Sequence, residues 1–157
     1  MEWLHIVRWL HIIGATILLG TGSGIAFFML MANRTRDPKI IAHTARTVVT
    51  ADYLFTALAV ILQPVTGALL AHAIGWKLSE PWIALSLALY VATGMFWLPV
   101  VWIQIQLRNL AEAAENGGTP LPPRYHELFR IWFLCGIPAF AAVLAIIWLM
   151  IARPTFG

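Results

Sequence analysis

Long apolar stretches alternate with short polar ones along the whole chain. Four of these stretches are long enough to cross the roughly 30 Å of a membrane's hydrocarbon core, which takes about 20 helical residues. We predict helices over about residues 3–32, 48–74, 82–107 and 131–152. Residues 112–124, rich in glycine, proline and asparagine, are predicted to form the longest loop. The pattern predicts an all-α fold, a four-helix transmembrane bundle in a single domain.

Composition supports this class of protein. Hydrophobic residues make up 61% of the 157 positions and charged residues 11%, with a mean hydropathy of +0.81. A soluble domain carries about 25% charged residues, so the lipid bilayer is the expected environment. The Lys and Arg residues are scattered at the ends of apolar runs, which argues against a nucleic-acid partner. The single cysteine, Cys135, excludes an internal disulfide and a cysteine-rich metal site.

Positive charge is distributed unequally between the two sides of the predicted bundle. The loops after the first and third helices, with their flanks, carry seven Lys and Arg residues, against three on the other side. Positive residues favour the cytoplasmic side, so we expect both termini on the periplasmic side of a bacterial inner membrane. The seven are Arg34, Arg36, Lys39, Arg46, Arg108, Arg124 and Arg130, and the three are Arg8, Lys77 and Arg153. The first apolar run lacks a basic leader and a cleavage site, so we expect a retained helix.

The first apolar run combines small residues with one ionisable side chain. Gly20 and Gly24 form a GxxxG pair, Gly14 adds small surface nearby, and His11 precedes them. Small residues let a second helix or a flat cofactor approach the backbone closely, and both interpretations stay open. Counted from the outer helix ends, His11, Gln63 and Tyr90 all lie about 10–14 Å deep at helical rise. We therefore expect these three side chains at one level.

A buried imidazole beside a glycine-lined groove suits a haem iron, which needs a neutral nitrogen ligand and room for the macrocycle. We expect haem b, bound non-covalently because no Cys-x-x-Cys-His motif is present, with His11 as axial ligand. His72 is the candidate second ligand, although it lies shallower. The alternatives are a hydrogen bond from His11 to a neighbouring helix and an interfacial role for His72. The predicted cofactor site comprises His11, His72, Gly14, Gly20, Gly24, Arg8, Gln63 and Tyr90, with Arg8, Lys77 or His5 at the propionates.

A second polar group is expected on the cytoplasmic side of the membrane. Its members are Asp52, Thr56, Gln104 and Gln106. One interpretation is an ion pair between Asp52 and Arg46 or Arg130. The other is a proton relay or a quinone-headgroup site, because ionisable residues within membrane segments are functional candidates.

Four segments carry a resemblance to a known family. They are LHIIGATILLGTGSGIAFF, ADYLFTALAVILQPVTG, WLPVVWIQIQLRNLA and IPAFAAVLAIIWLMIARP. Together they resemble the bacterial integral membrane proteins of domain-of-unknown-function family 2269, which is distantly similar to CopD-type and HemJ-type membrane proteins. The HemJ resemblance implies haem b binding through His11. The Trp, Ala-Gly and Pro-Arg that follow this histidine in HemJ-type chains are absent here, so the resemblance does not extend to protoporphyrinogen oxidation.

These observations favour a haem b-binding inner-membrane protein with an electron-transfer or small redox role, which would make it an oxidoreductase. A quinone or a redox protein is the expected partner. The alternatives are a non-catalytic assembly subunit and a small solute or metal-ion transporter, although four helices without a repeat suit alternating access poorly. We also expect a homodimer, formed through Gly20 and Gly24 or through an aromatic face with Trp97 and Trp102.

Overall fold

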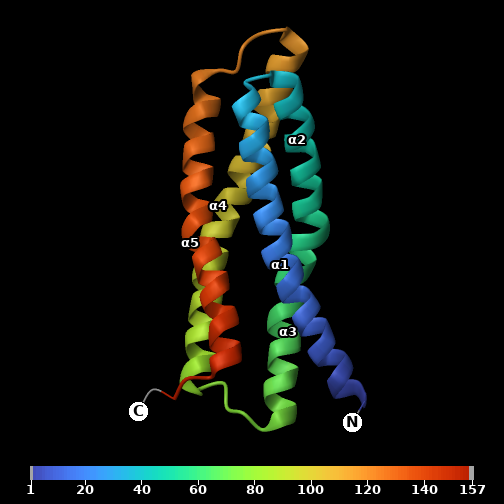
Figure 1. Cartoon of the computed structure of the whole chain (residues 1–157), viewed down its shortest axis with the longest axis vertical. Coiled ribbons are helices and arrows are strands. Elements are labelled where there is room, and N and C mark those ends of the chain that lie inside the picture. The colour runs from blue at the N-terminus through green and yellow to red at the C-terminus, as the bar shows by residue number, and fades with distance from the viewer. Residues whose placement is uncertain (1, 156–157) are drawn as a thin grey trace.

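The computed structural model describes residues 2–155, and every regular element in that range is helical. The elements are α1 (Glu2–Thr35), α2 (Pro38–Ala51), the π-helix η1 (Asp52–Thr56), α3 (Ala57–Ile74), α4 (Pro81–Gly117) and α5 (Pro123–Ala152). Because α2, η1 and α3 run on without a break, the described chain has four helices long and apolar enough to span a membrane (Figure 1). This confirms the predicted all-α, four-helix transmembrane architecture, and the protein is a multi-pass integral membrane protein.

Three helices extend beyond their predicted limits at the end of the bundle away from the termini. α2 begins at Pro38, α4 continues to Gly117 and α5 begins at Pro123. The start of α2 is fixed by Asp37, whose Oδ1 accepts a hydrogen bond of 2.9 Å from the Lys39 amide, followed by proline at the first helical position. α4 has 37 residues and is about 55 Å long at helical rise. It exceeds a hydrocarbon core of about 30 Å, so the helices project out of the membrane here.

The projecting turns are amphipathic, which is why hydropathy alone underestimates the length of these three helices. Ile41 and Ala45 of α2 are fully buried, as is Ala111 of α4. On the outer face of these turns the Arg46 guanidinium pairs with the carboxylates of Glu112 at 3.4 Å and Glu115 at 3.3 Å. The charges lower the mean hydropathy of both segments, but one face of each helix still packs into the bundle.

The main core fills this same half of the molecule. It joins the C-terminal half of α1 to α2, the second half of α4 and the first half of α5. Met29, Ile41, Leu107 and Tyr125, one from each of these helices, are completely buried. Toward the middle of the bundle, the buried Trp132 indole donates a hydrogen bond of 3.1 Å to the Gln104 side-chain oxygen. This half is therefore the tightly packed part of the fold.

The half that carries the chain ends is organised as two helix pairs. α3 packs against α1 and α4 packs against α5, whereas the backbone of α3 has almost no close approach to the backbones of α4 and α5. Figure 1 shows the two pairs apart at the lower end, where the start of α1 and the end of α5 both lie. A small cluster of Ala71, Trp82 and Ile83 closes this end, and the Arg153 guanidinium stacks over the Trp76 ring at 4.7 Å. Space is left between the pairs above this cluster.

Candidate functional site

A cavity of about 550 Å³ occupies the space between the two helix pairs. Residues of α1, η1, α3, α4 and α5 line it, and most of its wall is aliphatic or aromatic, as at Leu18, Ile137 and Phe140. Small-molecule sites in proteins typically measure about 300–1,000 Å³ and are mostly apolar with a few placed polar groups. The cavity has the size and the character of a ligand site within the membrane.

Its polar groups are concentrated where η1 faces α4. Asp52 and Thr56 line the cavity, and each is only 6% exposed. The Asp52 carboxyl faces the side chains of Thr56 and Trp97. Within residues 2–155, Asp52 forms no ion pair, and the Thr56 hydroxyl has no hydrogen-bond partner other than the Asp52 carboxyl that it faces. A buried polar pair with so few partners costs free energy in an apolar medium, so this pair is suited to a ligand that accepts hydrogen bonds.

The local backbone explains why both side chains face the cavity. Residues Asp52–Thr56 form a π-helix, in which the Ala57 amide donates to the Asp52 carbonyl five residues earlier. Asp52 and Thr56 are four positions apart, a spacing that keeps two side chains on one face of a helix, and both are buried. Single π-turns inside α-helices occur frequently at functional sites, and a carboxyl at membrane depth is a functional candidate by default.

The remaining hydroxyls on the wall already have partners. Ser23 donates to the Leu19 carbonyl at 2.5 Å and Thr93 donates to the Leu89 carbonyl at 2.8 Å, each within its own helix. The Tyr90 hydroxyl donates across to the Val60 carbonyl of α3. Their protons are used inside the protein. The Asp52–Thr56 pair is therefore where a ligand meets a carboxyl and a hydroxyl that has no other partner.

His11 lies next to this cavity but does not line it. Its Nδ1 is 2.8 Å from the Thr66 hydroxyl oxygen, and that hydroxyl donates at 2.7 Å to the Leu62 carbonyl. With the Thr66 proton on the Leu62 carbonyl, the matching tautomer of His11 carries its hydrogen on Nδ1, donates it to Thr66 and has its lone pair on Nε2. The expected hydrogen bond from His11 to a neighbouring helix is confirmed. The cavity wall begins one helical turn further along α1, at Ala15.

The predicted common level of His11, Gln63 and Tyr90 is confirmed. The Gln63 side-chain amide donates to the His11 carbonyl at 2.7 Å, which joins α1 to α3. Tyr90 binds the carbonyl of Val60, about one turn of α3 from Gln63. Gln63 and Tyr90 both line the cavity. The two residues lie on its wall toward the termini, and His11 lies behind Gln63.

The glycines of α1 differ in what they face. Gly14 is buried, and a Cβ there would overlap the Gln63 amide, so this glycine permits the close approach of α1 and α3. A Cβ at Gly20 would have no atom within 4 Å, and one at Gly24 would meet only the Phe28 ring of the same helix, at 4.0 Å. Neither Gly20 nor Gly24 lines the cavity. Within residues 2–155, the GxxxG pair takes no part in helix packing.

The structure does not bring His72 to His11. The His11 ring packs against Gly67, where a Cβ would lie 3.3 Å from Cε1. His72 is five positions further along α3, about 140° around the helix axis at 3.6 residues per turn, and it is exposed. Also exposed near the outer end of the bundle are His5, Arg8 and Lys77. Among residues 2–155, no three His, Cys, Asp or Glu side chains gather as a metal site.

The second predicted polar group is assembled in part. Gln104 lies on the cavity wall with Asp52 and Thr56, but Gln106 does not. The expected ion pair of Asp52 with Arg46 or Arg130 is wrong. The Arg46 guanidinium pairs with glutamates of α4 on the outer face, and within residues 2–155 Arg130 has no carboxylate at salt-bridge distance. Sequence reasoning missed Trp97 and the apolar wall of α5. The four-residue spacing of Asp52 and Thr56 within an apolar run is the signal that points to the cavity.

Comparison with known proteins identifies a family but no activity. The sequence profile of a family described as "Predicted integral membrane protein (DUF2269)" matches residues 5–154. No curated protein and no solved structure matches the chain.

Proposed function

The chain belongs to the DUF2269 family of predicted integral membrane proteins, and we propose that it binds a lipid-soluble quinone in the cavity between its helix pairs. The observation that supports this proposal is the buried Asp52 carboxyl beside the Thr56 hydroxyl, which has no other partner, on a largely apolar wall. A quinone presents carbonyl oxygens on a flat ring and carries an apolar tail. Thr56 donates to a carbonyl oxygen, and the aliphatic wall of α5 takes the tail.

The proposed site also suits a redox role for the bound quinone. Reduction of a quinone to a quinol takes up two electrons and two protons. Asp52 lines the cavity, and its carboxyl would pass one proton to a ring oxygen, take up another from water at the membrane surface and pass that on as the second. The electrons come from a redox partner of the protein. In this proposal the chain acts in electron transfer within the membrane.

Quinone binding should quench the protein's tryptophan fluorescence, because Trp97 and Trp132 line the cavity. With the protein in lipid nanodiscs, we expect saturable quenching on titration with a decyl-substituted benzoquinone. Thr56→Val keeps the shape of the side chain and removes one hydrogen bond of about 0.5–1.5 kcal/mol, so affinity should fall about two- to twelvefold. Unsaturable quenching of the wild type, or an unchanged affinity of Thr56→Val, would contradict the proposal and favour an assembly subunit.

Two glycines of α1 provide a matched pair of variants for the same measurement. Gly22 lines the cavity and Gly20 does not, and neither position has an atom within 4 Å of an added Cβ. Gly22→Leu should fill part of the cavity and weaken quinone binding, whereas Gly20→Leu should leave it unchanged. Equal effects of the two variants would show that the quinone binds elsewhere.

We propose a homodimer that uses the free Gly20 and Gly24 face of α1. This face contacts no other helix among the described residues, so a second copy can approach its backbone closely. Two-fold pairing is also the commonest symmetry of soluble oligomers. The Gly20→Leu control therefore has a second readout: it should convert dimers into monomers in detergent, as measured by sedimentation. A dimer that survives this substitution would place the contact on another face.

Haem b is the second candidate ligand, and the hydrogen bond of His11 favours it. Nδ1 is committed to Thr66, so Nε2 is the nitrogen with a free lone pair, which is the arrangement of a haem-ligating histidine. His11 would hold the iron and Arg8, one turn nearer the outer end, a propionate, although the His11 ring packs against Gly67 and does not line the cavity. His72 lies on another face of α3 and does not fit as the second ligand of the same iron. A bound haem would supply one-electron exchange beside the quinone site.

We propose that both termini lie in the periplasm of a bacterial inner membrane. The support is the seven-to-three distribution of Lys and Arg, which places the projecting helix ends in the cytoplasm. A reporter enzyme that works only in the periplasm should be inactive when inserted at Asn116, near the end of α4, and active in front of Glu2. The opposite pattern would refute this orientation and place the level of His11 in the cytoplasmic half of the membrane.

A further inference from the structure

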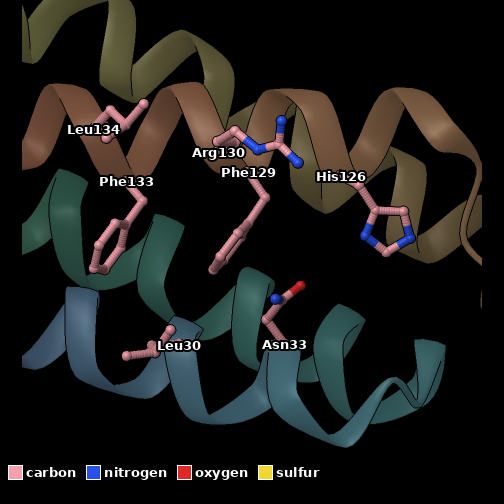
Figure 2. Close-up of a pocket in the computed structure, with 7 residues that line it drawn as sticks. All are labelled: Leu30, Asn33, His126, Phe129, Arg130, Phe133 and Leu134. Atoms are coloured by element: carbon pink, nitrogen blue, oxygen red, sulfur yellow. The ribbon is translucent and has the colours of Figure 1, made fainter.

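A second hollow lies between α1 and α5 at the other end of the bundle, and Phe133 is the one lining residue that it shares with the proposed quinone site. It has a volume of about 310 Å³ and is lined by two residues of α1 and five of α5. They are Leu30, Asn33, His126, Phe129, Arg130, Phe133 and Leu134, drawn in Figure 2. The following paragraphs call this hollow the α1–α5 groove.

The α1–α5 groove lies where both helices change from apolar to polar sequence. On α5 the uninterrupted apolar run begins after Arg130, and on α1 it ends before Asn33. The groove therefore spans the boundary between the hydrocarbon and the lipid headgroups. Its polar members gather on one side of this boundary, and Leu30, Phe133 and Leu134 lie on the other. This division matches the division of a phospholipid into a headgroup and acyl chains.

The polar rim of the groove offers hydrogen-bond donors and positive charge. Figure 2 shows the side chains of His126 and Asn33 directed into the gap from opposite helices, while the Arg130 guanidinium extends along α5 toward His126. Among residues 2–155, no carboxylate lies within salt-bridge distance of Arg130. By contrast, Arg46 and Arg124 at the same end of the bundle pair with glutamates. No acidic side chain lines the groove.

We propose that the α1–α5 groove is a binding site for an anionic phospholipid. The Arg130 guanidinium pairs with the lipid phosphate in the two-bond geometry that favours arginine, and Asn33 and His126 donate to headgroup oxygens. One acyl chain lies along Phe133 and Leu134, which are exposed on the lipid-facing side of α5. Basic pockets between membrane helices are recognised sites for anionic lipid headgroups. A free phosphate would leave the apolar floor of the groove uncovered, so the groove is better suited to a whole lipid.

Native mass spectrometry of the detergent-solubilised protein tests this site with phosphatidylglycerol and phosphatidylcholine of identical acyl chains. We expect the wild type to retain phosphatidylglycerol preferentially. Arg130→Gln should weaken its binding about fivefold, the effect of one basic residue at an anionic membrane surface. The matched control is Arg124→Gln on the same helix, because Arg124 already pairs with Glu127 at 3.2 Å. The control should retain wild-type lipid binding.

Three outcomes would overturn the proposal. Equal retention of the two lipids by the wild type would show that the site does not distinguish an anionic headgroup from a zwitterionic one. Equal loss in Arg130→Gln and Arg124→Gln would indicate a general charge effect of the bundle end. Binding of glycerol phosphate as tightly as of the lipid would indicate a site for a free anion. If Arg130→Gln proves poorly folded, two other variants test the site. Arg130→Lys keeps the positive charge, and the double variant Asn33→Leu with His126→Leu removes the two neutral donors. The double variant should weaken lipid binding more than Arg130→Lys.

Discussion

Replacing Trp132 with alanine should lower the free energy of unfolding by about 3–5 kcal/mol, the range for truncating a buried tryptophan or phenylalanine. Trp132 of α5 belongs to the main core, is 4% exposed and packs against Phe129. It also supplies the only hydrogen bond found to the Gln104 side chain among the described residues. Truncation removes this donor and opens a void at the inner end of the cavity. Unfolding in mixed detergent micelles, followed by helical circular dichroism, measures the loss.

Two comparisons separate volume from hydrogen bonding in this experiment. Trp148 lies on the same helix but is 58% exposed to lipid, so Trp148→Ala should cost far less. Trp132→Phe retains most of the ring volume but leaves the Gln104 oxygen without its donor, at a cost of about 1–3 kcal/mol. If Trp132→Ala proved as stable as Trp148→Ala, Trp132 would not belong to the tightly packed core.

Replacing His11 with alanine should remove nearly all bound haem if the protein carries haem b through this residue. The substitution deletes the Nε2 lone pair that would ligate the iron and leaves no other histidine at this depth between α1 and α3. The Soret band of the purified protein, expressed with excess haem precursor, measures the loss. Thr66→Val removes the oxygen that accepts from Nδ1 at 2.8 Å and fixes the ring, so haem affinity should fall about 10–100-fold.

The matched control for the haem experiment is His72→Ala. His72 is exposed on another face of α3, and its removal should leave the haem content unchanged. A colourless wild type would refute haem binding and leave the quinone proposal intact, because the cavity includes no histidine. Haem that survives in His11→Ala would refute the ligand assignment alone.

The architecture follows from hydropathy, but the cavity does not. Apolar length defines the four membrane helices, and helical rise places His11 and Gln63 at one level, where they form a hydrogen bond. The projecting ends are missed because residues such as Arg46 and Glu112 lower the hydropathy of helices that still bury one face. Sequence identifies Asp52 as a candidate, but its surroundings depend on how far α3 lies from α4 and α5. That separation is a property of packing between elements distant in sequence.

The glycines of α1 also show that sequence alone does not determine which helices pack together. A GxxxG pair indicates close approach of a partner, but it does not say whether the partner belongs to the chain. Gly20 and Gly24 contact no other helix among the described residues, whereas the less conspicuous Gly14 is the one against which Gln63 packs. Spacing identifies small surfaces, and the fold decides which of them is used.

The separation of the two helix pairs determines how a ligand is supplied. Ile137 and Phe140 line the cavity and are 54% and 42% exposed, so the wall continues onto the surface that faces the acyl chains. A lipid-soluble ligand of the proposed site would therefore enter sideways by diffusion within the membrane, without crossing water. Occupancy then depends on the mole fraction of the ligand in the membrane. Diluting the membrane with inert lipid should empty the cavity at constant total ligand, and adding buffer should not.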